Sequence, residues 1–170
     1  MSAFTGSADW YDLIYAVRGK DYAAEAAWVD AQLPSTPERR TWLDVGCGTG
    51  EHLRHWCQRH DVAGVDQNAS MLQVARAKLP DVPFVEADMR SLALGRTFDV
   101  VTSMFASVAY LPNAGAVSDA VQAMAHHVAP GGSLCIEPGV FPESVQPPVD
   151  QVTRFEGDGV VLERRTSTSI

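Results

Sequence analysis

Apolar and polar positions follow two different periods along the middle of this chain. Between residues 41 and 138, short apolar runs alternate with longer segments in which apolar residues recur every three or four positions. The short runs predict buried strands, and the longer segments predict amphipathic helices. The expected strands are 41–45, 62–66, 83–87, 98–104 and 133–138, and the expected helices are 51–60, 69–79 and 116–128, with a turn at 129–132 before the last strand.

This alternation of strands and helices predicts an α/β fold. Strands that are separated by helices pair in parallel, through right-handed crossovers. We therefore expect a Rossmann-like sheet of five parallel strands in the order 3-2-1-4-5. In such a sheet the ligand crevice lies at the carboxyl ends of the strands.

The pattern changes on both sides of this core. Residues 9–33 read as two helical pieces that are broken near Gly19, and a proline-rich link follows at 33–40. After Pro138 come a proline-rich stretch and two short strands around a Gly-Asp-Gly turn. The predicted organisation is a helical lid at 1–40, a ligand-binding core at 41–138 and the start of an antiparallel layer, for substrate or subunit contacts, at 139–170.

Composition narrows the class of partner. The chain has 170 residues, of which 46% are hydrophobic and 20% charged, and its formal net charge is −8. That length suits one domain with a core, and an acidic chain without a basic block argues against a nucleic-acid partner. The sequence shows no signal peptide and no apolar run of membrane-spanning length. We expect a small-molecule partner and no membrane partner, and a homodimer is compatible with the pattern.

The three cysteines lie in unrelated contexts, at positions 47, 57 and 135. Their odd number and scattered positions predict reduced thiols in a cytoplasmic protein. A histidine-rich helix at 51–60 resembles a metal site, but on a helix Cys57 points away from His55, so one tetrahedral site cannot use the whole set. We expect no metal. Cys47 lacks a histidine nearby in sequence, which weighs against a role as nucleophile.

The segment TWLDVGCGTG at 41–50 carries the strongest chemical signal. An apolar strand containing Asp44 passes into a glycine loop and then into a helix that opens with Glu51. The spacing G-x-G-x-G departs from the G-x-G-x-x-G of dinucleotide sites, although a generic loop for NAD or FAD stays an alternative. Two flanking carboxylates repel a diphosphate and suit a ligand with an ammonium or sulfonium centre, which points to S-adenosylmethionine. The predicted contacts from this loop are Asp44, Gly46, Cys47, Gly48 and Gly50.

Acids also follow the next two strands. Asp66 ends the second strand, where a carboxylate can accept hydrogen bonds from two ribose hydroxyls. It can equally cap the helix at 69–79, a role that Asn68 and Ser70 also suit. We include Gln67 and Met71 beside it in the predicted site. Asp88 and Met89 follow the third strand, and we expect them at the adenine; an ordinary acidic loop is the alternative.

The N-terminal helical segment carries Tyr11, Tyr15, Arg18 and Tyr22. Tyrosines at this spacing most often pack, with their hydroxyls reaching water. An arginine beside a glycine break can also pair bidentately with a carboxylate. Arg18 is therefore a candidate to hold the carboxylate of the cofactor, with the whole segment acting as a lid.

Four motifs taken together resemble the class I S-adenosylmethionine-dependent methyltransferases: LDVGCGTG, VAGVDQNASMLQVAR, EADMR and PGGSLCIEP. The stretch 10–145 is similar to the N,N-dimethyltransferases of nucleotide-linked aminosugars, which make the dimethylamino sugars of macrolide antibiotics such as desosamine and mycaminose. The resemblance implies cofactor contacts from Tyr15, Arg18 and Tyr22 in the lid, and from the loop 46–50, Asp66, Asp88, Met89 and Met104. It also implies that the sugar amine approaches Tyr15 and the loop 105–110.

Three features depart from that family. Tyr110 stands where some relatives carry a histidine, and EPGVF replaces a tryptophan-rich EPWWF pattern. The family also continues beyond the point where this chain stops, so we expect the last two sheet strands and most of the antiparallel layer to be missing. Exposed strand edges would follow from that.

Methyl transfer from a sulfonium is an in-line displacement that depends mainly on alignment. A neutral amine needs no strong base, and its proton can pass to water, to Glu137 or to a tyrosine. We therefore assign positioning roles to Tyr15 and Tyr110. Three alternatives remain open: an oxygen or carbon acceptor, a non-catalytic cofactor-binding fragment or regulatory partner, and an NAD-binding dehydrogenase domain.

Overall fold

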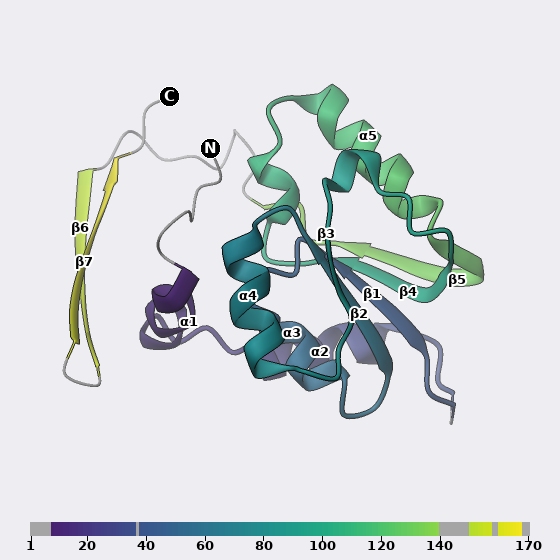
Figure 1. Cartoon of the computed structure of the whole chain (residues 1–170), viewed down its shortest axis with the longest axis horizontal. Coiled ribbons are helices and arrows are strands. Elements are labelled where there is room, and N and C mark those ends of the chain that lie inside the picture. The colour runs from purple at the N-terminus through teal and green to yellow at the C-terminus, as the bar shows by residue number, and fades with distance from the viewer. Residues whose placement is uncertain (1–7, 37, 140–149, 158–159, 168–170) are drawn as a thin grey trace.

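A computed structural model describes residues 8–36, 38–139, 150–157 and 160–167. Its centre is a sheet of five parallel strands in the order β3-β2-β1-β4-β5 (Figure 1). This arrangement confirms the predicted sheet and its strand order. The strands are β1 (Thr41–Val45), β2 (Asp61–Asp66), β3 (Phe84–Glu86), β4 (Phe98–Ser103) and β5 (Val128–Ile136).

Helices cover both faces of this sheet, and each face has its own apolar core. One core joins Trp42 and Val100 of the sheet to α2 and α3. The other joins Leu43 and Val101 to α5 and the two short 3₁₀ helices. The helices are α1 (Ala8–Val17), α2 (Tyr22–Gln32), α3 (Glu51–Trp56), α4 (Ala69–Lys78), η1 (Met89–Ser91), η2 (Ser107–Tyr110) and α5 (Ala114–Ala125). None of these described helices combines the length and apolar character needed to cross a bilayer.

The predicted turn at 129–132 is wrong, because these residues lie inside β5. Phe98 pairs with Val128 and Val100 pairs with Ser133, so the ladder skips the residues between them as a bulge. Gly131, at φ +79°, takes the left-handed conformation that this bulge contains. The bulge keeps one continuous strand where sequence indicated a break.

Two helices also end earlier than their periodicity predicts. Helix α3 ends at Trp56 instead of residue 60, and α5 ends at Ala125 instead of residue 128. After α5, the His127 carbonyl accepts a hydrogen bond from the Phe98 amide at 2.8 Å, so the chain has already joined the sheet there. At its start, α5 begins two residues earlier than predicted, at Ala114, because Asn113 caps it by accepting from the Ala116 amide.

The flanking segments have the predicted kinds of structure. Gly19, at φ +73°, separates α1 from α2, as the sequence indicated. Strands β6 (Asp150–Gly157) and β7 (Val160–Ser167) form an antiparallel hairpin outside the main sheet, on the side of α1 (Figure 1). The predicted Gly-Asp-Gly turn extends beyond the described residues.

Candidate functional site

The glycine loop begins where β1 ends. The amides of Gly46 and Cys47 donate to the Val65 carbonyl at 2.7 and 3.0 Å, which fastens the loop to the neighbouring strand β2. Helix η2 leaves no space for a side chain at Gly46, since a Cβ at this position would lie 2.6 Å from the Ser107 Cβ. These contacts within the protein fix the conformation of the loop without a ligand.

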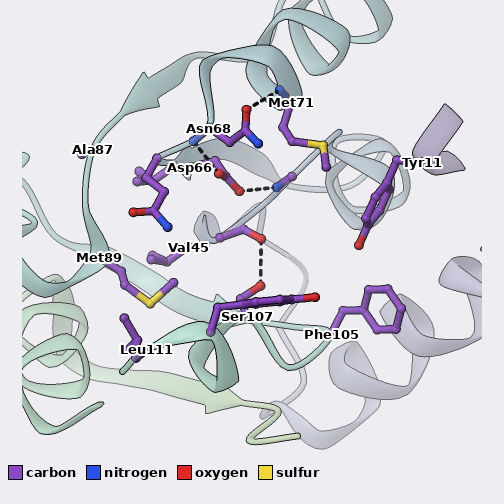
Figure 2. Close-up of a pocket in the computed structure, with 15 residues that line it drawn as sticks. Tyr11, Val45, Asp66, Asn68, Met71, Ala87, Met89, Phe105, Ser107 and Leu111 are labelled. Carbon is purple, nitrogen blue, oxygen red and sulfur yellow. Dashed lines mark hydrogen bonds between the residues drawn. The ribbon is translucent and has the colours of Figure 1, made fainter. Parts of the chain in front are cut away.

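Asp66 ties this loop to the start of α4. One carboxylate oxygen accepts from the Gly48 amide and the other from the Asn68 amide, both at 2.8 Å (Figure 2). Asn68 in turn caps α4 by accepting from the Ser70 and Met71 amides, which confirms the alternative capping role considered for it. Burial raises the pKa of the Asp66 carboxyl, although the amide donors partly offset this.

A hollow of about 190 Å³ opens at the carboxyl ends of the strands, beside Asp66. Figure 2 shows Met71 and Met89 facing it from different sides, one on α4 and the other on η1. Because carboxylate and aliphatic groups meet here, the hollow suits a flat apolar ring joined to a polar, hydroxylated part. Its apolar walls come from Val45, Val65, Met71, Ala87, Met89 and Leu111.

A smaller hollow adjoins the first and is more polar. Asp44 lies at its base, 2% exposed, and accepts a hydrogen bond from the Thr102 hydroxyl at 2.8 Å. Burial raises the pKa of Asp44 to about 6, against the opposing effects of His52 and Thr102. The two hollows form one cleft, because both are lined by Tyr11, Gly46, Gly48, Phe105 and Ser107.

Two features of the smaller hollow indicate room for a ligand. Among the described residues, none accepts a hydrogen bond from the buried Tyr22 hydroxyl, whose pKa is raised by burial so that it stays a donor. A Cβ at Gly48 would meet no atom of the described residues within 4 Å. A buried unpaired donor and bare backbone facing open space are both expected where a polar ligand binds.

Glu51 is placed differently from the sequence-based argument. Its carboxylate accepts a hydrogen bond from the Lys78 ammonium at 2.5 Å, and the same ammonium donates to Asp12 at 2.7 Å. Asp12 also accepts from the Thr49 hydroxyl, so helix α1 is fastened to the glycine loop. Glu51 lines the smaller hollow, as Asp44 does, but it shares one ammonium with Asp12, so part of its charge is offset.

Aromatic side chains form the outer rim of the cleft. The Tyr15 ring packs against Tyr11 and Phe105, with centroids 4.7 Å apart in each case. Tyr110 is 60% exposed at this rim. Phe105 and Ala106 both have positive φ, a conformation that costs roughly 1–3 kcal/mol for each non-glycine residue.

The structure brings most of the sequence-predicted site residues into this cleft. The larger hollow is lined by Gly46, Gly48, Asp66, Gln67, Met71, Met89 and Tyr110. Tyr22, Asp44, Cys47 and Met104 line the smaller hollow, together with Gly46 and Gly48. Four predicted residues line neither hollow: Tyr15, Arg18, Gly50 and Asp88.

Each of those four has another neighbour. Tyr15 packs on Phe105, and Arg18 is exposed, with its guanidinium 5.9 Å from the Tyr15 ring. Gly50 faces α4, since a Cβ there would lie 3.3 Å from Leu79. Asp88 is held by the Arg90 guanidinium, which lowers the pKa of that carboxyl. Direct cofactor contacts from these four residues stay predictions.

Sequence reasoning included Phe105 and Ser107 only within the loop 105–110, without a role for either, and it missed Leu111. They belong to the connection between β4 and α5, which has no clear apolar period. The Ser107 hydroxyl donates to the Gly46 carbonyl at 3.0 Å and so joins this connection to the glycine loop. Within the described ranges, no group of three or more histidine, cysteine or acidic residues is placed to hold a metal ion.

Comparison with known proteins identifies the family. Residues 43–132, more than half of the chain, match a family model described as a methyltransferase domain. The chain belongs to this methyltransferase family. The match begins in β1 and ends within β5, so it covers the sheet and the glycine loop.

The relatives of this methyltransferase include an N,N-dimethyltransferase of the kind that the sequence motifs resemble. It is 48% identical over 139 residues to the dTDP-3-amino-3,4,6-trideoxy-α-D-glucopyranose N,N-dimethyltransferase of Streptomyces venezuelae, covering 81% of this chain and 59% of the relative. The chain thus spans about three fifths of that relative's length.

Solved structures agree as well. The crystal structure of DesVI from Streptomyces venezuelae matches with a TM-score of 0.88 and 42% identity, covering 96% of this chain and 70% of that one. CalS10, an amino pentose methyltransferase from Micromonospora echinaspora bound to S-adenosylmethionine, matches with a TM-score of 0.83 and 38% identity, covering 92% and 67%. These matches confirm the Rossmann-like methyltransferase fold.

Proposed function

We propose that this methyltransferase binds S-adenosylmethionine and transfers its methyl group to the amine of a nucleotide-linked aminosugar. The observation that carries the proposal is the division of one cleft into two chemically different parts. The larger part is apolar and edged by Asp66, and the smaller part holds Asp44 and the Tyr22 hydroxyl, which has no acceptor among the described residues. The names of the relatives support the choice of acceptor.

The residues present fit the parts of this cofactor. The apolar walls around Met71 and Met89 would hold the adenine. A carboxylate has about four acceptor positions, so Asp66 retains acceptor capacity for a ribose hydroxyl beside its backbone amide donors. In the smaller hollow, Asp44 would attract the ammonium of the amino-acid end, and the Tyr22 hydroxyl would donate to its carboxylate.

When bound, S-adenosylmethionine supplies an electrophilic methyl group, which passes to the amine nitrogen as its carbon–sulfur bond breaks. The protein contributes mainly alignment and exclusion of water. The aromatic rim of Tyr11, Tyr15 and Phe105 would orient the amine and favour a cationic centre. Tyr15 and Tyr110 act as positioning groups in this scheme, and the excess proton of the product amine leaves to solvent.

We also propose a lid role for residues 1–40 and a cytoplasmic setting. The Asp12 contacts support the lid, because α1 is joined to the glycine loop by a hydrogen bond from Thr49 and to α4 by an ion pair with Lys78, and both contacts can break. The three cysteines, all free thiols, support the setting. The antiparallel layer at 139–170 and the homodimer stay predictions.

Cofactor binding is tested by calorimetric titration with S-adenosylmethionine and S-adenosylhomocysteine. Asp66→Ala removes charge-assisted hydrogen bonds, so we expect affinity to fall about ten- to a hundredfold. Asp61→Ala is the matched control, because Asp61 begins the same strand that Asp66 ends and is exposed. Equal affinity of the Asp66 variant and the control would contradict the proposed site.

Transfer is tested separately, by mass spectrometry of the acceptor. The probe is dTDP-3-amino-3,4,6-trideoxy-α-D-glucopyranose, and dTDP-glucose is the control because it lacks an amine. We expect one or two added methyl groups on the aminosugar and none on the control. Cofactor binding without methylation of the aminosugar would favour the alternative of a non-catalytic binding domain.

A further inference from the structure

The turn that follows β4 has an unfavourable backbone. Phe105 and Ala106 are consecutive residues with φ of +54° and +57°, and neither is a glycine. Side chains disfavour this left-handed region, so the turn needs contacts that hold it. Both residues lie beside the cleft, and Phe105 lines both of its parts.

The chain that leaves β5 holds this turn at several points. A Glu137 carboxylate oxygen accepts a hydrogen bond from the Phe105 amide at 2.7 Å. The Glu137 amide donates to the Ser103 carbonyl at 2.9 Å, which keeps the two strand ends in register. Gly139 packs so closely that a Cβ there would lie 2.8 Å from the Ala106 Cβ.

The ring of Phe105 is also contacted by the N-terminal segment, through Tyr15 and Lys20. Tyr15 meets it edge to face, and the Lys20 ammonium lies 3.9 Å from its centroid. Lys20 is itself paired with Glu25, which also contacts the His52 ring at 2.9 Å. The position of the ring therefore depends on Glu137 through the backbone and on the lid through the side chain.

We propose that Glu137 is a positioning residue for methyl transfer, which it serves by holding Phe105 where the ring aligns the acceptor amine. The inference rests on the proposed function. Its reason is geometric, because Phe105 lines both parts of the cleft and its ring is contacted by the N-terminal segment. A displacement of about 1 Å at such a point is enough to slow a reaction substantially.

This role differs from that of a proton acceptor, which sequence analysis left open for Glu137. The Phe105 amide already donates to one oxygen of the carboxylate. A glutamine keeps an oxygen that can accept this amide hydrogen bond, but it cannot accept a proton at neutral pH. The pair Glu137→Gln and Glu137→Ala therefore separates the two roles.

The experiment measures steady-state methylation of dTDP-3-amino-3,4,6-trideoxy-α-D-glucopyranose and calorimetric affinity for S-adenosylhomocysteine. Glu38→Ala is the control, since Glu38 is exposed on the link before β1. We expect Glu137→Ala to lower kcat about tenfold or more, with cofactor affinity retained within about threefold. Glu137→Gln should restore kcat to within about threefold of the unmutated chain.

A second variant protects the test against misfolding of Glu137→Ala. The added Cβ of Gly139→Ala would lie 2.8 Å from the Ala106 Cβ and displace the same turn. This variant should also lower kcat while cofactor affinity is retained. The ¹⁵N–¹H signal of Phe105 reports the hydrogen bond directly: it should shift strongly in Glu137→Ala and little in Glu38→Ala.

Three results would overturn the proposal. Wild-type kcat in folded Glu137→Ala would show that the turn needs no such support. Loss of activity in Glu137→Gln, with an unshifted Phe105 signal, would make Glu137 a proton acceptor instead. Failure of the unmutated chain to methylate the aminosugar would contradict the proposed function itself. This failure is distinguishable from the other two because it is seen in the unmutated chain.

Discussion

The Tyr22 hydroxyl shows how a single atom can mark a binding site. It is buried, and no described residue accepts its hydrogen bond. A buried polar group without a partner destabilises the fold, so its retention needs another explanation. Its place beside Asp44 in the smaller hollow offers one, because a ligand carboxylate there would complete the hydrogen bond.

The variant Tyr22→Phe removes one oxygen atom and so tests whether the Tyr22 hydroxyl binds the ligand. We expect the free energy of unfolding of the ligand-free protein to be unchanged or higher, because an unsatisfied hydroxyl is removed. Affinity for S-adenosylmethionine should fall about tenfold, since the lost bond is charge-assisted. Chemical denaturation and calorimetry measure the two effects. Tyr110→Phe, at the exposed rim, is the control, and an equal loss of affinity in both variants would refute the assignment.

At the scale of the element, the glycine loop is defined by backbone conformation and by what surrounds it. Gly46 and Gly48 both have positive φ, but they need to be glycine for different further reasons. Gly46 has no space for a Cβ because of Ser107, whereas Gly48 faces open space in the cleft. Only Gly48 can therefore be replaced in a way that probes the ligand more than the packing.

Gly48→Ala and Gly131→Ala form a matched pair. Both glycines have positive φ, and a Cβ at either would meet no described atom within 4 Å. Each variant should lose about 1 kcal/mol of stability through backbone strain. Only Gly48→Ala should also lose cofactor affinity, by about tenfold, because its methyl enters the cleft. Thermal unfolding and calorimetry measure both, and unchanged affinity in Gly48→Ala would place the ligand elsewhere.

At the scale of the whole molecule, stability depends on charges that the fold buries. Burial raises the pKa of Asp44 from 3.8 to about 6, so the folded state binds its proton more tightly than the unfolded state does. The stability from this group is therefore full below about pH 4 and is lost as pH rises through about 6. Asp66, whose pKa is also raised, acts in the same direction, whereas the lowered pKa values of Glu25, Asp88 and Asp99 act in the opposite one.

Asp44→Asn isolates this contribution. Relative to the variant, the unmutated protein should lose on the order of 2–3 kcal/mol of unfolding free energy between pH 4 and pH 7. Urea denaturation of both proteins across that range measures the difference. Parallel stability curves would show that Asp44 titrates alike in the folded and unfolded chains.

Much of the site was predictable because its residues belong to short, continuous motifs. Gly46, Gly48 and Asp66 follow directly after apolar strands, and parallel strands bring their carboxyl ends to one edge. Phe105 and Ser107 were not identified individually, because the connection after β4 has neither a period nor a glycine motif. Its shape comes from contacts with Glu137 and Gly46, which are distant in sequence.

The sequence by itself determined the parallel sheet, its strand order and the glycine loop, because local periodicity and spacing encode each of them. Tertiary structure decided which charges act in the cleft. Glu51 shares Lys78, which lies 27 positions away, with Asp12, while Asp44 is buried and accepts a hydrogen bond from Thr102, which lies 58 positions away. The physical reason is that charge pairing and burial are set by neighbours in space, and only the folded chain brings those neighbours together.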